Sequence, residues 1–302
     1  MHFFDASLAL NFKNKEYLRC AERIILGAFR EDQGSSGDVT TRFFVDQPRR
    51  VISAVVVAKE AGVLAGMPEA IWFLNQQGIR VAQKLTEGFS LKRRDAVMRI
   101  EGRCDHILAA ERTLLNLLQR MSGVATATRK LVSLLPARTP LLATRKTLWG
   151  LLDKRAVVVG GGWTHRLHLG DAILIKDNHL KLAKDHETAL VNAFKHAAHV
   201  RFIEVEVESV QAAKFVQAIY EAHQRHYRLE DRFAVLLDNF QPKVAAAIAP
   251  SLQKAGIVVE VSGNMNDATI WKYVLPGVSA ISSGAITNKA AAIDMSLDII
   301  NA

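Results

Sequence analysis

Six apolar runs between residues 141 and 284 constrain the fold of this chain more than any other feature. Each run ends in a polar or charged residue, and the ends lie about 20–32 residues apart, which leaves room for one helix and two loops between strands. This spacing is typical of parallel strand–helix units. The runs span residues 141–145, 172–176, 202–206, 233–238, 257–262 and 278–283. We predict an incomplete α/β barrel of about six strands.

The polar ends of these runs identify a candidate site. In barrels of this kind the active site lies at the C-terminal ends of the strands. The residues that we expect to gather there are Arg145, Lys146, Lys176, Glu206, Asp238 and Ser262. Such a ring of opposite charges suits a ligand with several negative charges, and a carboxylate pair on adjacent strands suits Mg²⁺, a ribose diol, or both.

The first part of the chain lacks the strand–helix repeat and is predicted to form a separate α+β layer. Its expected elements are a helix over residues 16–30, a strand over 51–58, a helix over 67–77, and strands near 79–83 and 96–101. Two further helices, over 105–118 and 126–135, are expected to be separated by a break at Ser122 and Gly123. We place the boundary between the two domains near residue 115.

Composition limits the class of protein. The 302 residues are 49% hydrophobic and 23% charged, which is ordinary for a globular protein, and no apolar stretch approaches the ~18 residues that a membrane span needs. Residues 1–5 lack the pattern of a signal peptide. Only two cysteines, Cys20 and Cys104, argue against a disulfide scaffold. These features predict a cytoplasmic protein without a membrane partner.

A net charge of +9 raises the alternative of a basic nucleic-acid-binding protein. The basic residues near the candidate site stand singly at strand ends, without the lysine runs and aromatic residues typical of such proteins. The carboxylates of Glu204, Glu206, Glu208 and Asp238 would also repel phosphates. We therefore expect no nucleic-acid partner, and salt-dependent binding of an oligonucleotide would reverse that view.

Three glutamates alternate with valines in the third run. Glu204, Glu206 and Glu208 share one face of the predicted strand, which would point into the barrel. Buried carboxylates need compensating cations, and Lys176 ends the neighbouring strand. The alternative is an edge strand with a solvated face. Whether Glu204 or Glu206 is the main carboxylate for ribose or metal stays undecided.

Glycines mark the remaining candidate segments. Gly160, Gly161 and Gly162 allow a ligand to approach the main chain before His165 and Arg166, which can donate to a carboxylate, although a flexible turn is the alternative. Two later turns, one with Ser262 and Gly263 and one with Ser283 and Gly284, can cradle a phosphate with backbone N–H groups. Each could also be a plain turn. Together these segments predict a phosphorylated substrate with several negative charges, and a sugar pyrophosphate with Mg²⁺ meets every requirement.

In their order along the chain, these motifs resemble the quinolinate phosphoribosyltransferase family. The stretches that carry the resemblance are residues 59–66, 110–116, 144–147, 160–166, 175–179, 204–207, 237–239, 262–263 and 283–285. The resemblance implies Mg²⁺-dependent transfer of phosphoribosyl from phosphoribosyl pyrophosphate to quinolinate, with decarboxylation to nicotinate mononucleotide. It also implies an open-faced α/β sandwich of residues 1–115, joined by the tail 286–302, a barrel of residues 116–285, and a homodimer with shared active sites.

The resemblance also assigns roles to individual residues. Arg145, His165 and Arg166 would bind the two carboxylates of quinolinate, and Arg112 would reach into the active site of the partner subunit. Lys146 would meet the phosphate groups of phosphoribosyl pyrophosphate.

The donor substrate would be held by residues from the other strand ends. Lys176 would contact its pyrophosphate, and Glu206 and Asp238 would hold the ribose hydroxyls and Mg²⁺. Catalysis would rest on Lys146, Lys176, Glu206 and Asp238. The remaining substrate-binding residues would be Thr144, Ser262, Gly263, Ser283 and Gly284.

Some positions depart from the family pattern. Trp149 stands where a proline is usual, Thr164 replaces an asparagine, and His168 replaces a glycine, so the differences cluster at residues 149–168 beside the expected substrate pocket. An insertion around residues 223–231 is expected to be a surface loop. A related pyrophosphorylase-like protein of molybdenum transport, which shares the fold, is the alternative enzyme. The intact motif at residues 175–179 favours the quinolinate enzyme.

Overall fold

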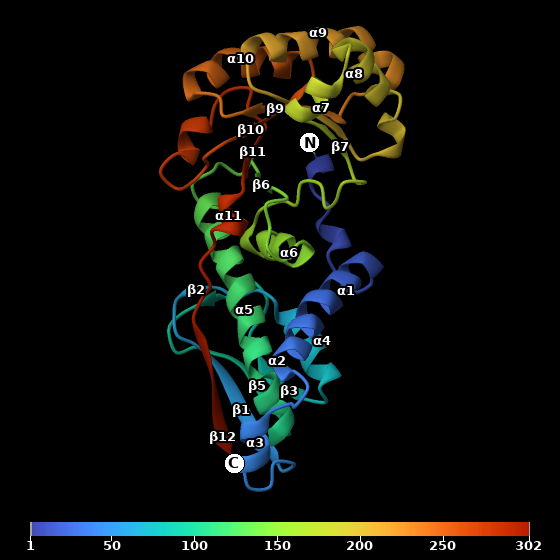
Figure 1. Cartoon of the computed structure of the whole chain (residues 1–302). Coiled ribbons are helices and arrows are strands. Elements are labelled where there is room, and N and C mark those ends of the chain that lie inside the picture. Colours follow the sequence, from blue (N-terminus) through green and yellow to red (C-terminus); the bar gives the residue numbers. More distant parts are fainter. Residues whose placement is uncertain (1, 302) are drawn as a thin grey trace. The chain divides into compact units, whose positions relative to one another are not determined.

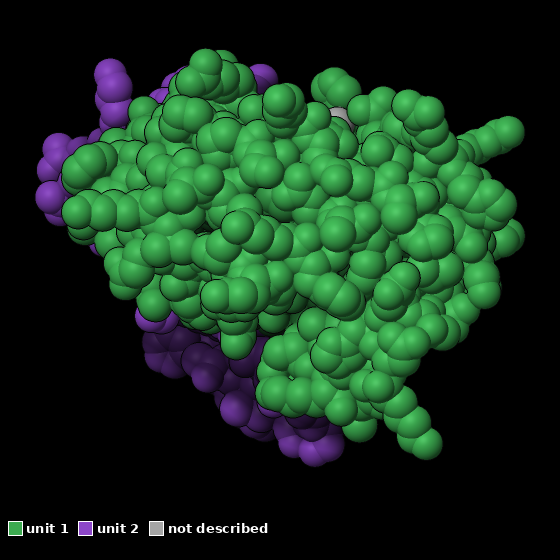
Figure 2. Space-filling model, turned by 90° about the horizontal axis from the view of Figure 1, so that it is seen from above, with its two compact units in different colours: residues 1–7, 130–147, 161–288 green, residues 8–129, 148–160, 289–302 purple. Residues whose placement is uncertain are grey.

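The computed structural model describes residues 2–301, which form two compact units, coloured separately in Figure 2. Unit 1 comprises Met1–Ser7, Lys130–Thr147 and Gly161–Asn288, and unit 2 comprises Leu8–Arg129, Leu148–Gly160 and Lys289–Ala302. The outermost residues of the predicted domains, Met1 and Ala302, lie outside the described part of the chain. The division of the chain into folding domains near residue 115 stays a prediction.

Unit 1 is built on a curved parallel sheet (Figure 1). Within residues 2–301 the sheet has six strands, and β6 and β7 lie at its two open edges. In spatial order the strands are β6 (Leu141–Ala143), β11 (Ala280–Ser283), β10 (Val258–Ser262), β9 (Phe233–Asp238), β8 (Ile203–Val207) and β7 (Ile173–Ile175). All neighbouring pairs are parallel. The predicted incomplete barrel is therefore confirmed, and each apolar run of the sequence overlaps one of its strands.

The helical segments of unit 1 begin with η1 (His2–Phe4), which precedes the sheet, and end with α11 (Ala285–Asn288), which follows its last strand. Those between the strands are α7 (Asp177–Leu182), α8 (His186–Phe194), η4 (Ala197–His199), α9 (Val210–Tyr227), α10 (Pro242–Lys254) and η5 (Ile270–Tyr273). Ser209 caps α9 by accepting the N–H of Ala212 (3.1 Å), and Arg228 ends the helix in the left-handed conformation (φ 54°). The expected surface loop at residues 223–231 is therefore wrong for its first half, because α9 extends through it.

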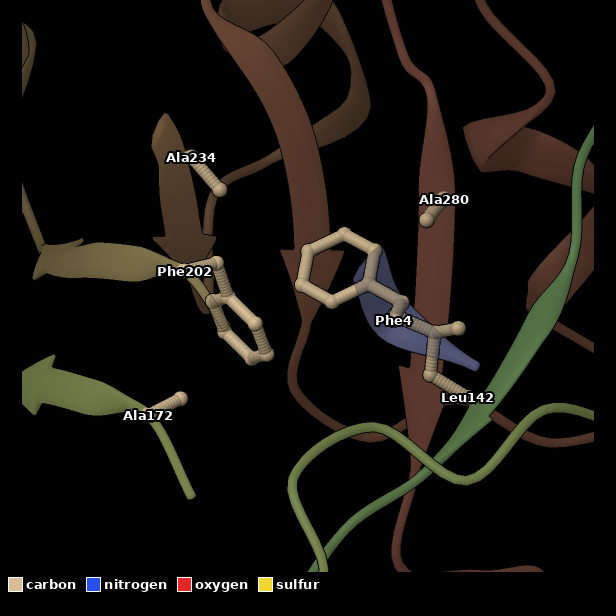
Figure 3. Packing of buried hydrophobic residues seen from close by; sticks show 6 residues of the cluster. All are labelled: Phe4, Leu142, Ala172, Phe202, Ala234 and Ala280. Carbon is tan, nitrogen blue, oxygen red and sulfur yellow. The ribbon is translucent and has the colours of Figure 1, made fainter. Parts of the chain in front are cut away.

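Apolar side chains fill the inside of the sheet at the N-terminal ends of its strands (Figure 3). The cluster consists of Phe4, Leu142, Ala172, Phe202, Ala234 and Ala280. Phe4 comes from the N-terminal segment and is completely buried, and its ring meets that of Phe202 edge-on at 5.0 Å. Since this end of the interior is closed by hydrocarbon, charged side chains are confined to the levels nearer the C-terminal ends.

Unit 2 contains a four-stranded antiparallel sheet. Its order is β12 (Met295–Asn301), β1 (Val51–Ala58), β5 (Ala96–Arg103) and β3 (Arg80–Lys84), and a separate pair is formed by β2 (Gly62–Val63) and β4 (Ser90–Leu91). Alternate residues of β1 are buried, as expected for a strand with one face on a core. The three strands predicted in this part of the chain are confirmed as β1, β3 and β5.

The remaining helical segments belong mainly to unit 2. They are η2 (Ser7–Ala9), α1 (Lys15–Ala21), η3 (Glu22–Leu26), α2 (Gly27–Gln33), α3 (Val39–Phe44), α4 (Met67–Gln76), α5 (Cys104–Val132) and α6 (Leu151–Gly160). The helices predicted over 16–30 and 67–77 are confirmed as the α1–η3–α2 run and α4. Among residues 2–301, no helix combines the length and apolar character that crossing a membrane requires.

The predicted break at Ser122 and Gly123 is wrong, because α5 runs through both residues without interruption. Ser122 uses its hydroxyl to accept the N–H of Ala65 (3.1 Å). A Cβ on Gly123 would lie 2.0 Å from the carbonyl oxygen of Ala291. The glycine therefore permits close approach of the C-terminal segment to the helix, a contact that local sequence cannot reveal.

Helix α6 follows β6 along the chain and yet belongs to unit 2. The carboxylate of Asp153 is completely buried and accepts the N–H groups of Leu148 (2.9 Å) and Trp149 (3.1 Å) just before the helix. The guanidinium of Arg120 on α5 pairs with the same carboxylate, with Nε–Oδ1 and Nη2–Oδ2 distances of 3.0 and 2.9 Å. This ion pair fixes α6 within unit 2.

The other end of α6 also depends on close packing against α5. A Cβ on Gly160 would lie 2.6 Å from the carbonyl oxygen of Ala125 and 2.6 Å from Cβ of Thr128. Gly161 then turns the chain with φ +97°. Helix contact, rather than the approach of a ligand, accounts for Gly160.

We predict that Gly123→Ala lowers the free energy of unfolding by about 1–3 kcal/mol, because the added methyl group collides with the backbone at Ala291. Helix propensity alone predicts that Gly123→Ala would raise the free energy of unfolding, because alanine favours helix more than glycine does. Gly27→Ala is the matched control, since nothing lies within 4 Å of its added Cβ, and it should stabilise by about 0.5–1 kcal/mol. Urea denaturation of both variants measures the difference, and equal effects would contradict the packing explanation.

Candidate active site

The loop after β6 meets the loop after β11 at the C-terminal side of the sheet. The hydroxyl of Thr144 accepts the N–H of Lys146 (3.1 Å), and the hydroxyl of Thr287 donates to the carbonyl of Lys146 (2.7 Å). A Cβ on Gly284 would lie 3.0 Å from Cδ of Lys146 and 3.3 Å from the hydroxyl of Thr144. Three of the predicted site residues, Thr144, Lys146 and Gly284, therefore lie together.

Lys176 and Glu206 form an ion pair across neighbouring strands. Lys176 follows β7, and Glu206 lies on β8 with its side chain mostly buried. The ammonium of Lys176 donates to Oε2 of Glu206. The backbone N–H of Lys176 also donates to Nδ1 of His179 (2.9 Å), which fixes the start of α7. Two of the residues expected at the strand ends therefore lie together.

Asp238 and Ser262 are paired residues at the ends of β9 and β10. The Ser262 hydroxyl donates to Oδ1 of Asp238, and the side-chain amide of Asn239 donates to Oδ2 (2.8 Å). Gly263 has φ +100°, and a Cβ there would lie 2.2 Å from Oδ1 of Asn239. A side chain at position 263 would therefore displace the asparagine that orients Asp238.

Arg166 is a buried cation with incomplete hydrogen bonding. It is 6% exposed, and Nη1 donates to the carbonyl of Ala172 at 3.4 Å. Its Nε has no hydrogen-bond partner among residues 2–301. Burial, and then the positive charge of Arg145, lower the pKa of Arg166. Two guanidinium groups near enough to repel each other, one with an unused N–H, are suited to bind an anion such as a carboxylate.

His165 lies next to Arg166 and points toward two carboxylates inside the sheet. Its Nε2 is 2.9 Å from Oε2 of Glu204 and 3.2 Å from Oε2 of Glu260, and all three residues are buried. Burial and the charge of Glu260 raise the pKa of Glu204 to about 7. Burial alone would lower the pKa of His165, but the carboxylates of Glu260 and Glu204 outweigh it and raise this pKa to about 9.

A second ion pair supports the segment that carries Arg166. Arg201 donates from Nε to Oδ1 of Asp171 (2.6 Å) and from Nη2 to Oδ2 (2.5 Å), and Nη2 also donates to the carbonyl of His165 (2.9 Å). Oδ2 of Asp171 accepts the N–H of Leu167 (2.7 Å). Burial would raise the pKa of Asp171, but the hydrogen bonds from Arg201 and from the N–H of Leu167, together with the charge of Arg201, outweigh burial and lower it. The backbone on both sides of Arg166 is thus held by side chains.

In residues 2–301, the side chains of two predicted site residues form no hydrogen bond with the other predicted site residues at the strand ends. Ser283 is buried, and its hydroxyl donates to the carbonyl of Met265 (2.8 Å). Arg112 lies on α5 in unit 2 with an exposed side chain. Its predicted role in a partner subunit stays a prediction.

Sequence reasoning missed Glu260, Asp171 and Arg201. The alternation rule applied to Glu204 and Glu206 could have found Glu260, which shares a strand face with Ser262 two positions later. Asp171 and Arg201 have no such signal, because they lie in loops 30 residues apart.

Glu206 and Asp238 are the strand-end carboxylates that could hold a magnesium ion. Glu206 and Asp238 offer hard oxygen ligands, and Mg²⁺ usually takes one or two carboxylates together with substrate phosphates. The lysines nearby would neutralise the remaining charge of such a substrate.

Removing the Asp171 carboxylate should destabilise the protein. Asp171→Asn is expected to lower the free energy of unfolding by about 1–3 kcal/mol at pH 7. Because the folded pKa of Asp171 is lowered, this contribution is fully present above the unfolded pKa of about 3.9 and disappears as the pH falls through the folded value. Urea denaturation between pH 3 and 7 measures it.

Asp267→Asn is the matched control, because Asp267 pairs with Lys130 at 2.5 Å on the exposed surface of the same unit. Its effect should be far smaller, since water competes with the pair. An Asp171→Asn effect that matched this control, or that grew toward acid pH, would show that the pair does not brace the segment.

Comparison with known proteins identifies relatives along most of the chain. The family model described as "Quinolinate phosphoribosyl transferase, C-terminal domain" matches residues 124–298, and its N-terminal counterpart matches residues 38–122. A protein of Archaeoglobus fulgidus named "Probable nicotinate-nucleotide pyrophosphorylase (carboxylating)" is 36% identical over 277 residues, covering 87% of this chain and 98% of that protein. The chloroplastic nicotinate-nucleotide pyrophosphorylase (carboxylating) of Arabidopsis thaliana is 34% identical, covering 91% of this chain and 82% of that protein.

Solved structures show the same fold. The nicotinate-nucleotide pyrophosphorylase of Francisella tularensis superimposes with a TM-score of 0.80 at 31% identity, covering 93% of this chain and 96% of that one. NadC from Streptococcus pyogenes gives a TM-score of 0.80 at 32% identity, covering 92% and 96%. The similarity therefore extends over both units of the chain.

Proposed function

Because this chain belongs to the quinolinate phosphoribosyltransferase family, we propose that it transfers phosphoribosyl from phosphoribosyl pyrophosphate to quinolinate with loss of CO₂. The products are nicotinate mononucleotide and pyrophosphate, so the protein is a pentosyltransferase of NAD biosynthesis. The observation that carries the proposal is the pair of Arg145 and Arg166, with the buried and unpartnered Nε of Arg166. Quinolinate supplies two carboxylates on one ring.

Arg145 and Arg166 bind the carboxylates of the acceptor, and His165 lies behind them. The guanidinium of Arg166 is buried and donates to the carbonyl of Ala172, and the backbone of its segment is held by Asp171 and Arg201. A rigid cation fixes the acceptor ring, so the ring nitrogen approaches the ribose in one orientation. Part of the entropy that two substrates lose on coming together is then lost on binding, and it no longer adds to the barrier of the chemical step.

The donor is held by the strand-end loops. Lys146 and Lys176 contact the phosphate and pyrophosphate groups, and Glu206 and Asp238 hold the ribose hydroxyls. The 5′-phosphate meets backbone N–H groups near Ser262, Gly263, Ser283 and Gly284, beside Thr144. When bound by Glu206 and Asp238, Mg²⁺ would offset negative charge on the pyrophosphate. Departure of the phosphates would return Lys176 to its ion pair with Glu206.

The reaction needs no protein nucleophile. The ring nitrogen forms a bond to ribose C1 while the C1–oxygen bond breaks and its electron pair leaves with pyrophosphate. The carboxylates of Glu206 and Asp238 favour the positive charge that develops on the ribose, and Lys146 and Lys176 favour the charge of the leaving group. The ring nitrogen is then cationic, so the ring accepts the electron pair of the carbon–carbon bond as CO₂ departs, and a proton replaces the carboxylate.

Assembly and location complete the proposal. We infer a homodimer in which Arg112 enters the partner's site, as the family resemblance implies, and the exposed side chain of Arg112 on α5 supports this inference. We also infer a cytoplasmic location, because a chain with only two cysteines is not built on a disulfide scaffold.

Incubation with quinolinate, phosphoribosyl pyrophosphate and Mg²⁺ should release CO₂ and nicotinate mononucleotide in equal amounts. A chelator should abolish release, and added Mg²⁺ should restore it, because the leaving group carries several negative charges. Radiolabelled carboxylate and chromatography measure the two products. Normal binding of phosphoribosyl pyrophosphate without binding of quinolinate would instead favour the relative of molybdenum transport, and release of neither product would reject the proposal.

Mixing two inactive variants tests the shared site. In a dimer of one Arg112→Ala and one Lys176→Ala subunit, one site keeps both residues, so random reassembly should restore about a quarter of wild-type activity. The control mixes Lys176→Ala with Asp238→Ala, which belong to the same subunit's site and should give no rescue. Failure of the first mixture, with mixed dimers detected by mass spectrometry, would place Arg112 outside the partner's site.

A further inference from the structure

The N-terminal segment, residues 2–6, belongs to unit 1 and holds no residue that the proposed reaction uses. The side chain of its Phe4 is nevertheless completely buried inside the parallel sheet, and Figure 3 shows the ring between Phe202 and Ala280. Leaving this position would expose the whole aromatic side chain to water. The segment is therefore held in one place by the core of the unit.

A buried hydroxyl joins the N-terminal segment to the loop that leads into Arg166. Thr164 is completely buried, and its Oγ1 accepts the backbone N–H of Ala6 at 2.8 Å. The hydrogen of the same hydroxyl can point to the carbonyl of Phe4 (3.3 Å) or of His165 (2.9 Å). Thr164 is also one of the positions that depart from the family pattern. Its hydroxyl makes a contact to a segment far away in the sequence.

Two ring contacts lie on either side of this hydrogen bond. The rings of His2 and Trp163 are stacked with centroids 5.9 Å apart and an interplanar angle of 23°. Phe4 stacks on His165 with centroids 5.0 Å apart and an angle of 20°. Three consecutive residues, 163–165, thus contact the N-terminal segment. Because protein interiors are closely packed, a displacement of the segment is transmitted to these residues.

The loop makes a strained turn at the point of contact. Trp163 exchanges two backbone hydrogen bonds with β6, at 2.8 and 2.9 Å, and Arg201 donates to the carbonyl of His165 at 2.9 Å. Between these anchors the backbone of His165 has φ +52°, a conformation that is uncommon outside glycine and is kept only where surrounding contacts enforce it. The N-terminal segment supplies such contacts, through Thr164 and through the face of the imidazole.

We propose that the N-terminal segment positions the acceptor-binding loop: the ring of Phe4 and the Ala6–Thr164 hydrogen bond hold the turn that presents His165 and Arg166 to the acceptor. Phe4 and Thr164 are positioning residues, because they act through the two residues that follow Thr164. This inference rests on the proposed function, which assigns Arg166 to a carboxylate of the acceptor.

Kinetics of two variants at position 164 test the hydrogen bond. Thr164→Val removes the hydroxyl with little change of shape, so the N–H of Ala6 loses this acceptor. It should raise KM for quinolinate on the order of fivefold or more and leave KM for phosphoribosyl pyrophosphate nearly unchanged, because the residues that hold the donor belong to other segments. Thr164→Ser keeps the hydroxyl and should restore most of the loss. Equal rises in both KM values, no rise, or no rescue by serine would overturn the proposal.

A pair of phenylalanine variants separates positioning from core stability. Phe4→Leu removes the ring that stacks on His165 and keeps an apolar side chain in the core. Phe233→Leu is the matched control, because Phe233 is also buried in unit 1 but packs against Tyr220 on α9 (4.8 Å) and Phe194 on α8 (5.4 Å). Both variants should unfold at lower urea concentration, and only Phe4→Leu should raise KM for quinolinate. The same KM in both variants would show that Phe4 is a core residue alone and would overturn its positioning role.

Amide hydrogen exchange, measured by mass spectrometry on the protein without ligands, tests the coupling without activity. In Thr164→Val, exchange should become several-fold faster in peptides that cover residues 2–6 and also in those that cover residues 165–170, because the two segments are held together. In Phe233→Leu both sets of peptides should exchange as in wild type. Faster exchange confined to residues 2–6 would overturn the inference, whereas the expected exchange pattern in a protein that does not turn over quinolinate would reject only the proposed function.

Discussion

Compensation of buried charge governs the inside of the parallel sheet. Apolar side chains around Phe4 fill its N-terminal end, so every charged group above them must find a partner in a region that water barely reaches. Lys176 neutralises Glu206, and Nε2 of His165 lies 2.9 Å from Oε2 of Glu204 and 3.2 Å from Oε2 of Glu260. Arg166 is the exception, with an N–H that no residue of the described chain accepts. We propose that the substrate completes this pairing.

Much of this arrangement could be predicted from the sequence, because parallel strands bring their carboxyl ends to one edge whatever lies between them. That rule alone placed Lys176 with Glu206 and Asp238 with Ser262, and the six apolar runs gave the six strands. Period-two alternation also indicated that Glu204 faces inward, and the structure shows it as the buried carboxylate of the histidine cluster.

What could not be predicted depends on contacts between segments far apart in the chain. Gly123 reads as a helix break until the backbone of Ala291 is seen against it. Arg201 reads as a surface residue until Asp171 and the carbonyl of His165 are found at its guanidinium. In both cases the residue type is explained by a distant partner, and no local pattern contains that partner.

The placement of α6 has a consequence for how this chain can be divided. The chain leaves unit 1 after Thr147 and returns at Gly161, and the excursion is held by Arg120 and Asp153. A fragment cut at residue 129 would carry Asp153 away from its arginine and leave a carboxylate without its counterion. The segments of the two units consequently alternate along the chain, and neither unit can be excised or exchanged as one uninterrupted stretch of sequence.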